Sequence, residues 1–204
     1  MKVAQGQEAC EQSAQIIRSG GVIAFRTDTF YGLGADPLND KAVAQIRELK
    51  GREDTKPILL LISDESVVGR FIKHPPPLFA EVARRFWPGP LTIVGGARPE
   101  LPEELTAGSG TIGLRLPDDE GLRDLVRICG GALTATSANL SGGEPAKSVE
   151  EVHCYFPTQI DLIIDGGEVS ATKPSTVVDL SGTHPRLVRE GAITASELDM
   201  ILSR

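Results

Sequence analysis

Aromatic residues are scarce in this sequence of 204 residues, of which they make up only 4%. The scarcity excludes a core built on aromatic rings, so packing must rest on Val, Ile, Leu and Ala. These residues are plentiful, because 40% of the chain is hydrophobic. A charged fraction of 24% beside that hydrophobic fraction excludes a disordered composition. We therefore expect a folded chain of one domain.

A surplus of positive charge is also missing, since the formal net charge is -7. Proteins that neutralise phosphates over a broad surface need such a surplus, so a globally basic nucleic-acid binder is not favoured, although a local basic cleft remains open.

Cysteine is rare: Cys10, Cys129 and Cys154 are far apart and form no C-x-x-C pair, which favours a reduced protein. No apolar stretch reaches membrane-spanning length. We expect a cytoplasmic protein with no membrane partner.

Several short motifs that define sites are absent. The sequence holds no G-x-x-x-x-G-K-[ST], because Ala146 stands where the second glycine would precede Lys147 and Ser148, so any nucleotide site is not a P-loop. No G-x-G-x-x-G follows a strand, and no G-x-S-x-G nucleophile motif occurs. The three histidines are scattered without metal-ligand spacing. We therefore predict no metal site made of protein side chains.

Apolar runs of strand length alternate with segments of helical periodicity along the chain. The patterns predict helices at 8–19, 78–86 and 120–129, a short one after Ser63, and one capped by Asn39 or Asp40 and ended by Gly51. Two more are opened by capping boxes at Ser148 and Thr194. They predict strands at 22–25, 58–62, 91–94, 111–116, 132–136, 162–164, 175–180 and 186–189. Residues 98–109 are expected to form a loop. Because the last strands follow each other directly, we predict an α/β fold with a mixed sheet.

Three polar blocks follow these elements. Residues 27–34, T-D-T-F-Y-G-L-G, come after a strand and are expected to form a polar loop that lets the backbone approach a ligand. Residues 50–52, K-G-R, with Lys56 beyond them, end a helix, and residues 137–143, S-A-N-L-S-G-G, follow another strand. Each block alone has a plainer interpretation, as a solvated helix end or a turn. Together they predict one concave face that holds an anionic substrate through Arg and Lys.

Two further features are open to interpretation. Arg115 lies on the face of its strand opposite the apolar residues, and this face could be solvent-exposed or could floor a pocket for a carboxylate or phosphate. Residues 87–91, W-P-G-P-L, predict a rigid turn with a buried indole.

Taken together, residues 27–34, 50–52, 87–92 and 137–142 resemble the YrdC/Sua5 family in sequence, order and spacing. The resemblance runs over about 12–191. It implies a single YrdC-like domain over 1–204, with a twisted mixed sheet flanked by helices and one large concave face. Arg26 and Leu61 depart from the family, in which many members have proline and histidine there. Few residues follow the similar region, so we expect the short form of the family.

The family resemblance implies an enzyme, a threonylcarbamoyl-AMP synthase. Such a nucleotidyltransferase condenses L-threonine, bicarbonate and ATP, with Mg²⁺ accompanying ATP, and releases pyrophosphate. Its product feeds the threonylcarbamoylation of the adenosine beside the anticodon in tRNA, so tRNA and the threonylcarbamoyl-transfer enzymes are expected partners. The alternative is a non-catalytic RNA-binding module of the same fold, for tRNA or double-stranded RNA.

The resemblance also implies functional residues, position by position. The implied catalytic set is Lys50, Arg52, Ser137 and Asn139. The implied ATP contacts are Arg52, Lys56, Thr111, Ser137 and Arg189. The implied threonine contacts are Thr29, Arg115, Ser175 and the backbone near Ala135.

Overall fold

The computed structural model describes residues 1–51 and 57–202, so the predicted contacts of Arg52 and Lys56 lie outside the described residues. The strands are β1 (Lys2–Ala4), β2 (Ile23–Arg26), β3 (Tyr31–Gly34), β4 (Leu59–Ile62), β5 (Leu91–Gly96), β6 (Thr111–Arg115), β7 (Ala132–Ser137), β8 (Leu162–Asp165), β9 (Thr176–Asp179) and β10 (Arg186–Arg189). The helices are α1 (Gln7–Arg18), α2 (Asp40–Lys50), α3 (Val68–Phe71), α4 (Pro77–Phe86), α5 (Glu103–Thr106), α6 (Glu120–Ile128), α7 (Val149–Tyr155) and α8 (Ala195–Leu202), with a 3₁₀ turn at Glu65–Val67.

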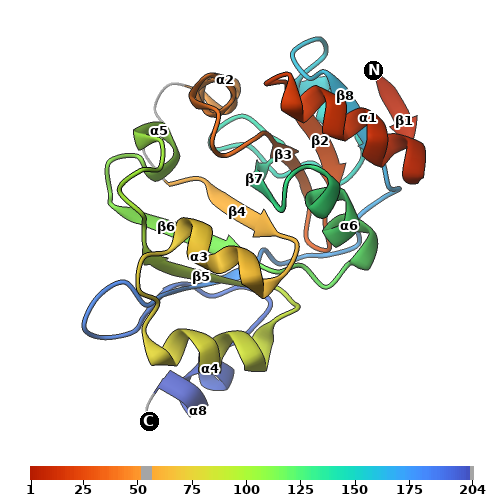
Figure 1. The fold of residues 1–204 in the computed structure, drawn as a ribbon. Helices are drawn as coiled ribbons and strands as arrows, with labels where there is room; N and C mark the ends of the chain where they lie inside the picture. Colours follow the sequence, from red (N-terminus) through yellow and green to blue (C-terminus); the bar gives the residue numbers. More distant parts are fainter. Residues whose placement is uncertain (52–56, 203–204) are drawn as a thin grey trace.

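The strands form one sheet in the order β1-β8-β2-β3-β7-β4-β6-β5-β9-β10 (Figure 1). Four pairs of neighbouring strands are parallel: β1–β8, β2–β8, β4–β6 and β5–β9. Five pairs are antiparallel: β2–β3, β3–β7, β4–β7, β5–β6 and β9–β10. The prediction of a mixed sheet is therefore confirmed.

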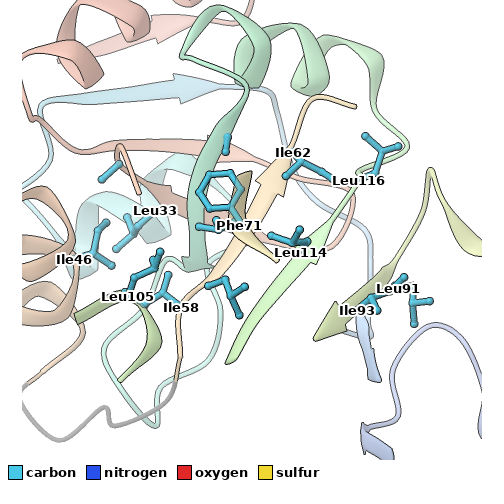
Figure 2. Close-up of a cluster of buried hydrophobic side chains, with 14 of the residues drawn as sticks. Leu33, Ile46, Ile58, Ile62, Phe71, Leu91, Ile93, Leu105, Leu114 and Leu116 are labelled. Carbon is cyan, nitrogen blue, oxygen red and sulfur yellow. The ribbon is translucent and has the colours of Figure 1, made fainter. Parts of the chain in front are cut away.

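Two hydrophobic clusters cover the two faces of the sheet. One cluster holds side chains of α2, α4, α5, α7 and α8. Figure 2 shows part of it, with Ile46 of α2 and with Leu33 of β3, Leu114 of β6 and Ile93 of β5. The other cluster packs α1 and α6 against β2, β7 and β8. These two helices lie together on one side in Figure 1. Leu61 of β4 also belongs to this second cluster, whereas no residue of β6 or β9 does.

Several predicted helix ends are confirmed. The Asn39 side chain caps α2 by accepting hydrogen bonds from the first turn, and Gly51 ends the helix with a φ of 92°. Ser148 caps α7 by accepting from the Glu151 amide. No helix in the described ranges has the length and apolar character needed to cross a membrane.

The expected polar loop at 27–34 is only half correct. Residues 31–34 are strand β3, which pairs with both β2 and β7. Gly34 is required because the Phe25 ring packs against the strand: a Cβ on Gly34 would lie 2.5 Å from Phe25 Cε1. Glycine in this stretch therefore marks a close packing contact within a sheet, not a turn.

Two other elements were not predicted. The expected loop at 98–109 contains α5, which begins after Pro102 with Glu103 and Glu104 in its first turn, where acidic side chains favour the helix dipole. Strand β1 pairs in parallel with β8, although it is short and has little apolar sequence. Such an edge strand is specified by its partner more than by its own residues.

Candidate active site

A cavity of about 340 Å³ lies on the sheet face that α1 and α6 leave uncovered. Its walls come from β3, β4, β6, β7, the end of α2 and the loops that follow β2 and β7. Leu61 and Ala135 belong both to the cluster under α6 and to the cavity wall, so the cavity adjoins that cluster. The concave face expected from the sequence is present.

The cavity wall is cationic. It holds Arg47, Lys50, Arg115 and Arg189, while none of its described residues is Asp or Glu. This concentration of one sign is notable in a chain of net charge -7. Like charges gathered in a hollow favour binding of an anion, because the ligand relieves their mutual repulsion.

Arg115 forms the floor of the cavity and is only 3% exposed. Its Nε donates to the Gly89 carbonyl at 3.0 Å, Nη1 donates to Thr29 Oγ1 at 3.3 Å, and Nη2 pairs with the Asp28 carboxylate. Burial lowers the pKa of Arg115, the nearby charge of Arg189 lowers it further, and Asp28 opposes both effects. The guanidinium is thus held in a fixed plane, with N–H groups left for a planar anion.

Arg189 reaches the same cavity from β10. Its Nη2 donates to the Ser175 carbonyl at 2.8 Å and to Ser175 Oγ at 3.1 Å. Ser175 Oγ in turn lies 3.2 Å from Thr92 Oγ1. Burial lowers the pKa of Arg189. These contacts tie Arg189 of β10 to the start of β9 and to β5, and they hold a second guanidinium near the first.

Lys50 joins the end of α2 to the loop after β7. Its Nζ donates to the carbonyl of Ser137 at 2.7 Å, the carbonyl of Asn139 at 2.9 Å and Asn139 Oδ1 at 3.1 Å, and it lies 3.4 Å from Ser137 Oγ. Lys50 of the second polar block therefore contacts the third block. Ser137 of the third block also pairs with Gly32 of the first block across β7 and β3, so all three blocks are neighbours.

The loop before β3 is fixed by a single hydroxyl. Thr27 Oγ1 accepts hydrogen bonds from the amides of Thr29 and Phe30 and donates to the Phe30 carbonyl. It also lies 3.1 Å from Thr29 Oγ1. This turn presents Thr29 to Arg115, which is the kind of local side-chain bonding that Thr provides.

The structure brings most of the predicted site residues together. The cavity wall contains Thr29, Lys50, Arg115, Ala135, Ser137, Asn139, Ser175 and Arg189. Thr111 is not part of the described wall: it starts β6, and its hydroxyl lies 2.9 Å from Ser109 Oγ. The burial of the Trp87 indole, which donates to the Leu91 carbonyl, confirms the predicted turn. That turn supplies the Gly89 carbonyl to Arg115.

Two residues of the site were missed from the sequence. Arg47 lines the cavity one helical turn before Lys50, and this i, i+3 spacing is a signal that places both on one face. Arg47 Nε donates to the Glu104 carbonyl of α5. Asp28 stands inside the first polar block, but its pairing with Arg115 joins strands that are far apart in the sequence and leaves no local pattern.

No group of three or more His, Cys, Asp or Glu in the described part of the chain could hold a metal ion. The donor set of the cavity is cationic and hydroxylic, which suits phosphate oxygens and not a dication.

The fold and the cavity define an α/β protein with a preformed anion site on one bare sheet face. Residues 15–191 match the Sua5/YciO/YrdC family, described as telomere recombination, and the chain belongs to that family. The fold expected from the resemblance is therefore confirmed.

Individual relatives carry more specific names. The chain is 36% identical to the threonylcarbamoyl-AMP synthase of Pyrococcus abyssi over 93% of its own length and 56% of that protein's. It is 36% identical to the enzyme of the same name from Halorhodospira halophila, over 85% of this chain and 92% of that one. The crystal structure of P. abyssi Sua5 complexed with L-threonine superposes with a TM-score of 0.92 at 35% identity, covering 99% of this chain and 60% of that one. The chain thus spans little more than half of the P. abyssi protein.

Proposed function

We propose that this chain is a threonylcarbamoyl-AMP synthase, an enzyme that joins L-threonine, bicarbonate and ATP and releases pyrophosphate. The observation that carries the proposal is the cationic cavity, whose described wall has four Arg or Lys side chains and no carboxylate. The names of the relatives and the L-threonine complex of one of them support it. The same names do not favour the RNA-binding alternative, whose module would not need an enclosed site.

The reaction brings together two anions that repel each other. The amine of threonine takes up bicarbonate, with loss of water, to give an N-carboxylate, and this carboxylate attacks the α-phosphorus of ATP as the bond to pyrophosphate breaks. The protein must cancel the repulsion before the reactants can touch, and preformed cations in a hollow do so at little cost in reorganisation. Most of the catalysis is then positioning.

At the threonine end, Arg115 is the group for the carboxylate, because its guanidinium is buried, oriented and still has N–H donors. Thr29, which accepts a hydrogen bond from Arg115, and Ser175 also line the wall, and we assign them and the backbone near Ala135 to the same end. At the nucleotide end, Ser137 and Arg189 face the phosphates. Contacts of ATP with Arg52, Lys56 and Thr111 remain predictions from the family resemblance.

Mg²⁺ would accompany ATP, coordinated by phosphate oxygens, since the described wall offers it no carboxylate. Its contribution when bound is to neutralise charge on the leaving pyrophosphate. The product would serve tRNA modification through threonylcarbamoyl-transfer enzymes in the cytoplasm.

The test is mass detection of threonylcarbamoyl adenylate from the purified chain with ATP, Mg²⁺, threonine and bicarbonate. Threonine-dependent release of pyrophosphate should accompany it, and serine in place of threonine tests the amino-acid class. Lys41→Met, an exposed change on α2, is the matched control for changes in the cavity. A wild-type chain that releases no pyrophosphate and forms no adenylate under these conditions refutes the proposal.

A further inference from the structure

Resting on the proposed function, we infer that Lys50 and Asn139 are positioning residues. Their polar atoms are committed to each other and to the loop after β7, so they act on ATP through the Ser137 hydroxyl. Of the catalytic set expected from the sequence, Lys50 and Asn139 then form a clamp within the protein and Ser137 contacts the phosphates, while Arg52 lies outside the described residues.

The Lys50 ammonium has three N–H bonds, and the loop surrounds it with four oxygen atoms between 2.7 and 3.4 Å away. Only 6% of the residue is exposed. A phosphate could approach this ammonium only by displacing oxygens that already solvate it. A buried ammonium loses much by giving up such partners, so exchange for a ligand is unfavourable.

The Asn139 amide is committed in the same way. Both N–H bonds of Nδ2 are used, by the carbonyls of Leu140 and Gly143 at 2.7 Å each, and Oδ1 accepts from Lys50. The side chain therefore has no N–H left to donate to a phosphate. Its function is to hold the loop closed around the ammonium.

The backbone strengthens this clamp. The Ser141 amide donates to the Lys50 carbonyl at 2.9 Å, and the Ala138 amide donates to the Tyr31 carbonyl at 2.8 Å. The end of α2 and the strand β3 thus hold the loop from two sides. Ser137 differs from its neighbours: among the described residues, none accepts a hydrogen bond from its hydroxyl, which lines the cavity.

Binding of ATP alone tests the inference, because it needs no turnover. Lys50→Met and Ser137→Ala should each weaken ATP binding by about tenfold, the loss expected for one charge-assisted hydrogen bond. If Lys50 acts through Ser137, the double variant should bind no more weakly than Lys50→Met. Multiplied losses of about a hundredfold in the double variant overturn the inference. Lys41→Met is the control.

A second measurement concerns the substrate-free protein. Lys50→Met and Asn139→Ala should each speed hydrogen exchange at the amides of 138–143 without speeding it in β4, since the clamp forms without a ligand. Lys50→Arg should not rescue the loop, because a planar fork does not match four oxygens around a point. Unchanged exchange in Asn139→Ala, which leaves Lys50 in place, contradicts the clamp. Failure of the wild type to bind ATP would instead contradict the proposed function.

Discussion

Thr176→Val tests how the last strands of the sheet are attached to the cavity. Thr176 is fully buried; its Oγ1 donates to the Ile193 carbonyl at 2.6 Å and accepts from the amides of Gly191 and Ile193 at 2.9 Å each. Valine keeps the shape and leaves three backbone groups without their partner. At about 1 kcal/mol for each buried group, the low end of the usual range, the free energy of unfolding falls by about 3 kcal/mol.

For a chain of this length that loss lowers the unfolding temperature by about 6–12 °C. Calorimetry and urea titration measure it. Because Arg189 precedes the affected turn, the KM for ATP should also rise, by about tenfold if one contact is lost. The matched control is Thr176→Ser, which keeps the hydroxyl and removes one methyl group, at about 1 kcal/mol. If the valine variant is as stable as the serine variant, the three hydrogen bonds contribute nothing and the reasoning is wrong.

Three further changes have definite outcomes. Arg115→Met should raise the KM for threonine by about a hundredfold and that for ATP far less, as steady-state kinetics would show; equal effects on both would contradict the assigned end of the cavity. Burial raises the pKa of Cys129 to about 12, so this thiol should resist iodoacetamide at pH 8 in the folded protein while the exposed Cys154 reacts. Since the unfolded thiol ionises first, stability contributed by Cys129 is present below pH 9 and lost as pH rises towards 12, a loss absent in Cys129→Ala. Gly191→Ala should unfold at a lower temperature than wild type, because its Cβ would lie 2.3 Å from the Pro174 carbonyl oxygen.

The sequence predicted the alternation of strands and helices well where periodicity was long and capping residues were present, as in α2, which begins after Asn39 and ends at Gly51. It failed where the cause was a partner distant in the chain. The glycines of β3 suggest a loop, and the reason for Gly34, its contact with the Phe25 ring, is visible only in the folded chain. Strand β1 depends on β8 in the same way.

The candidate site follows the same rule. Motif order and family resemblance were enough to name Lys50, Ser137 and Arg115 as neighbours in one cavity. They could not reveal that the ammonium is enclosed by loop oxygens, or that Asp28 pairs with Arg115, because both are properties of the folded geometry. Residue identity predicts which chemistry is available, and packing decides which atoms remain free to perform it.

The contact between Phe25 and Gly34 constrains how this sheet can change over time. The ring occupies the space that any larger residue at position 34 would need, so position 34 cannot gain a side chain without strain while Phe25 is present. In homologous sequences, a side chain at position 34 should appear only where position 25 holds a small residue. Such paired substitution would record the hairpin's geometry in an alignment. It also offers a route to redesign, since a smaller residue at position 25 should lower the strain of an alanine at position 34.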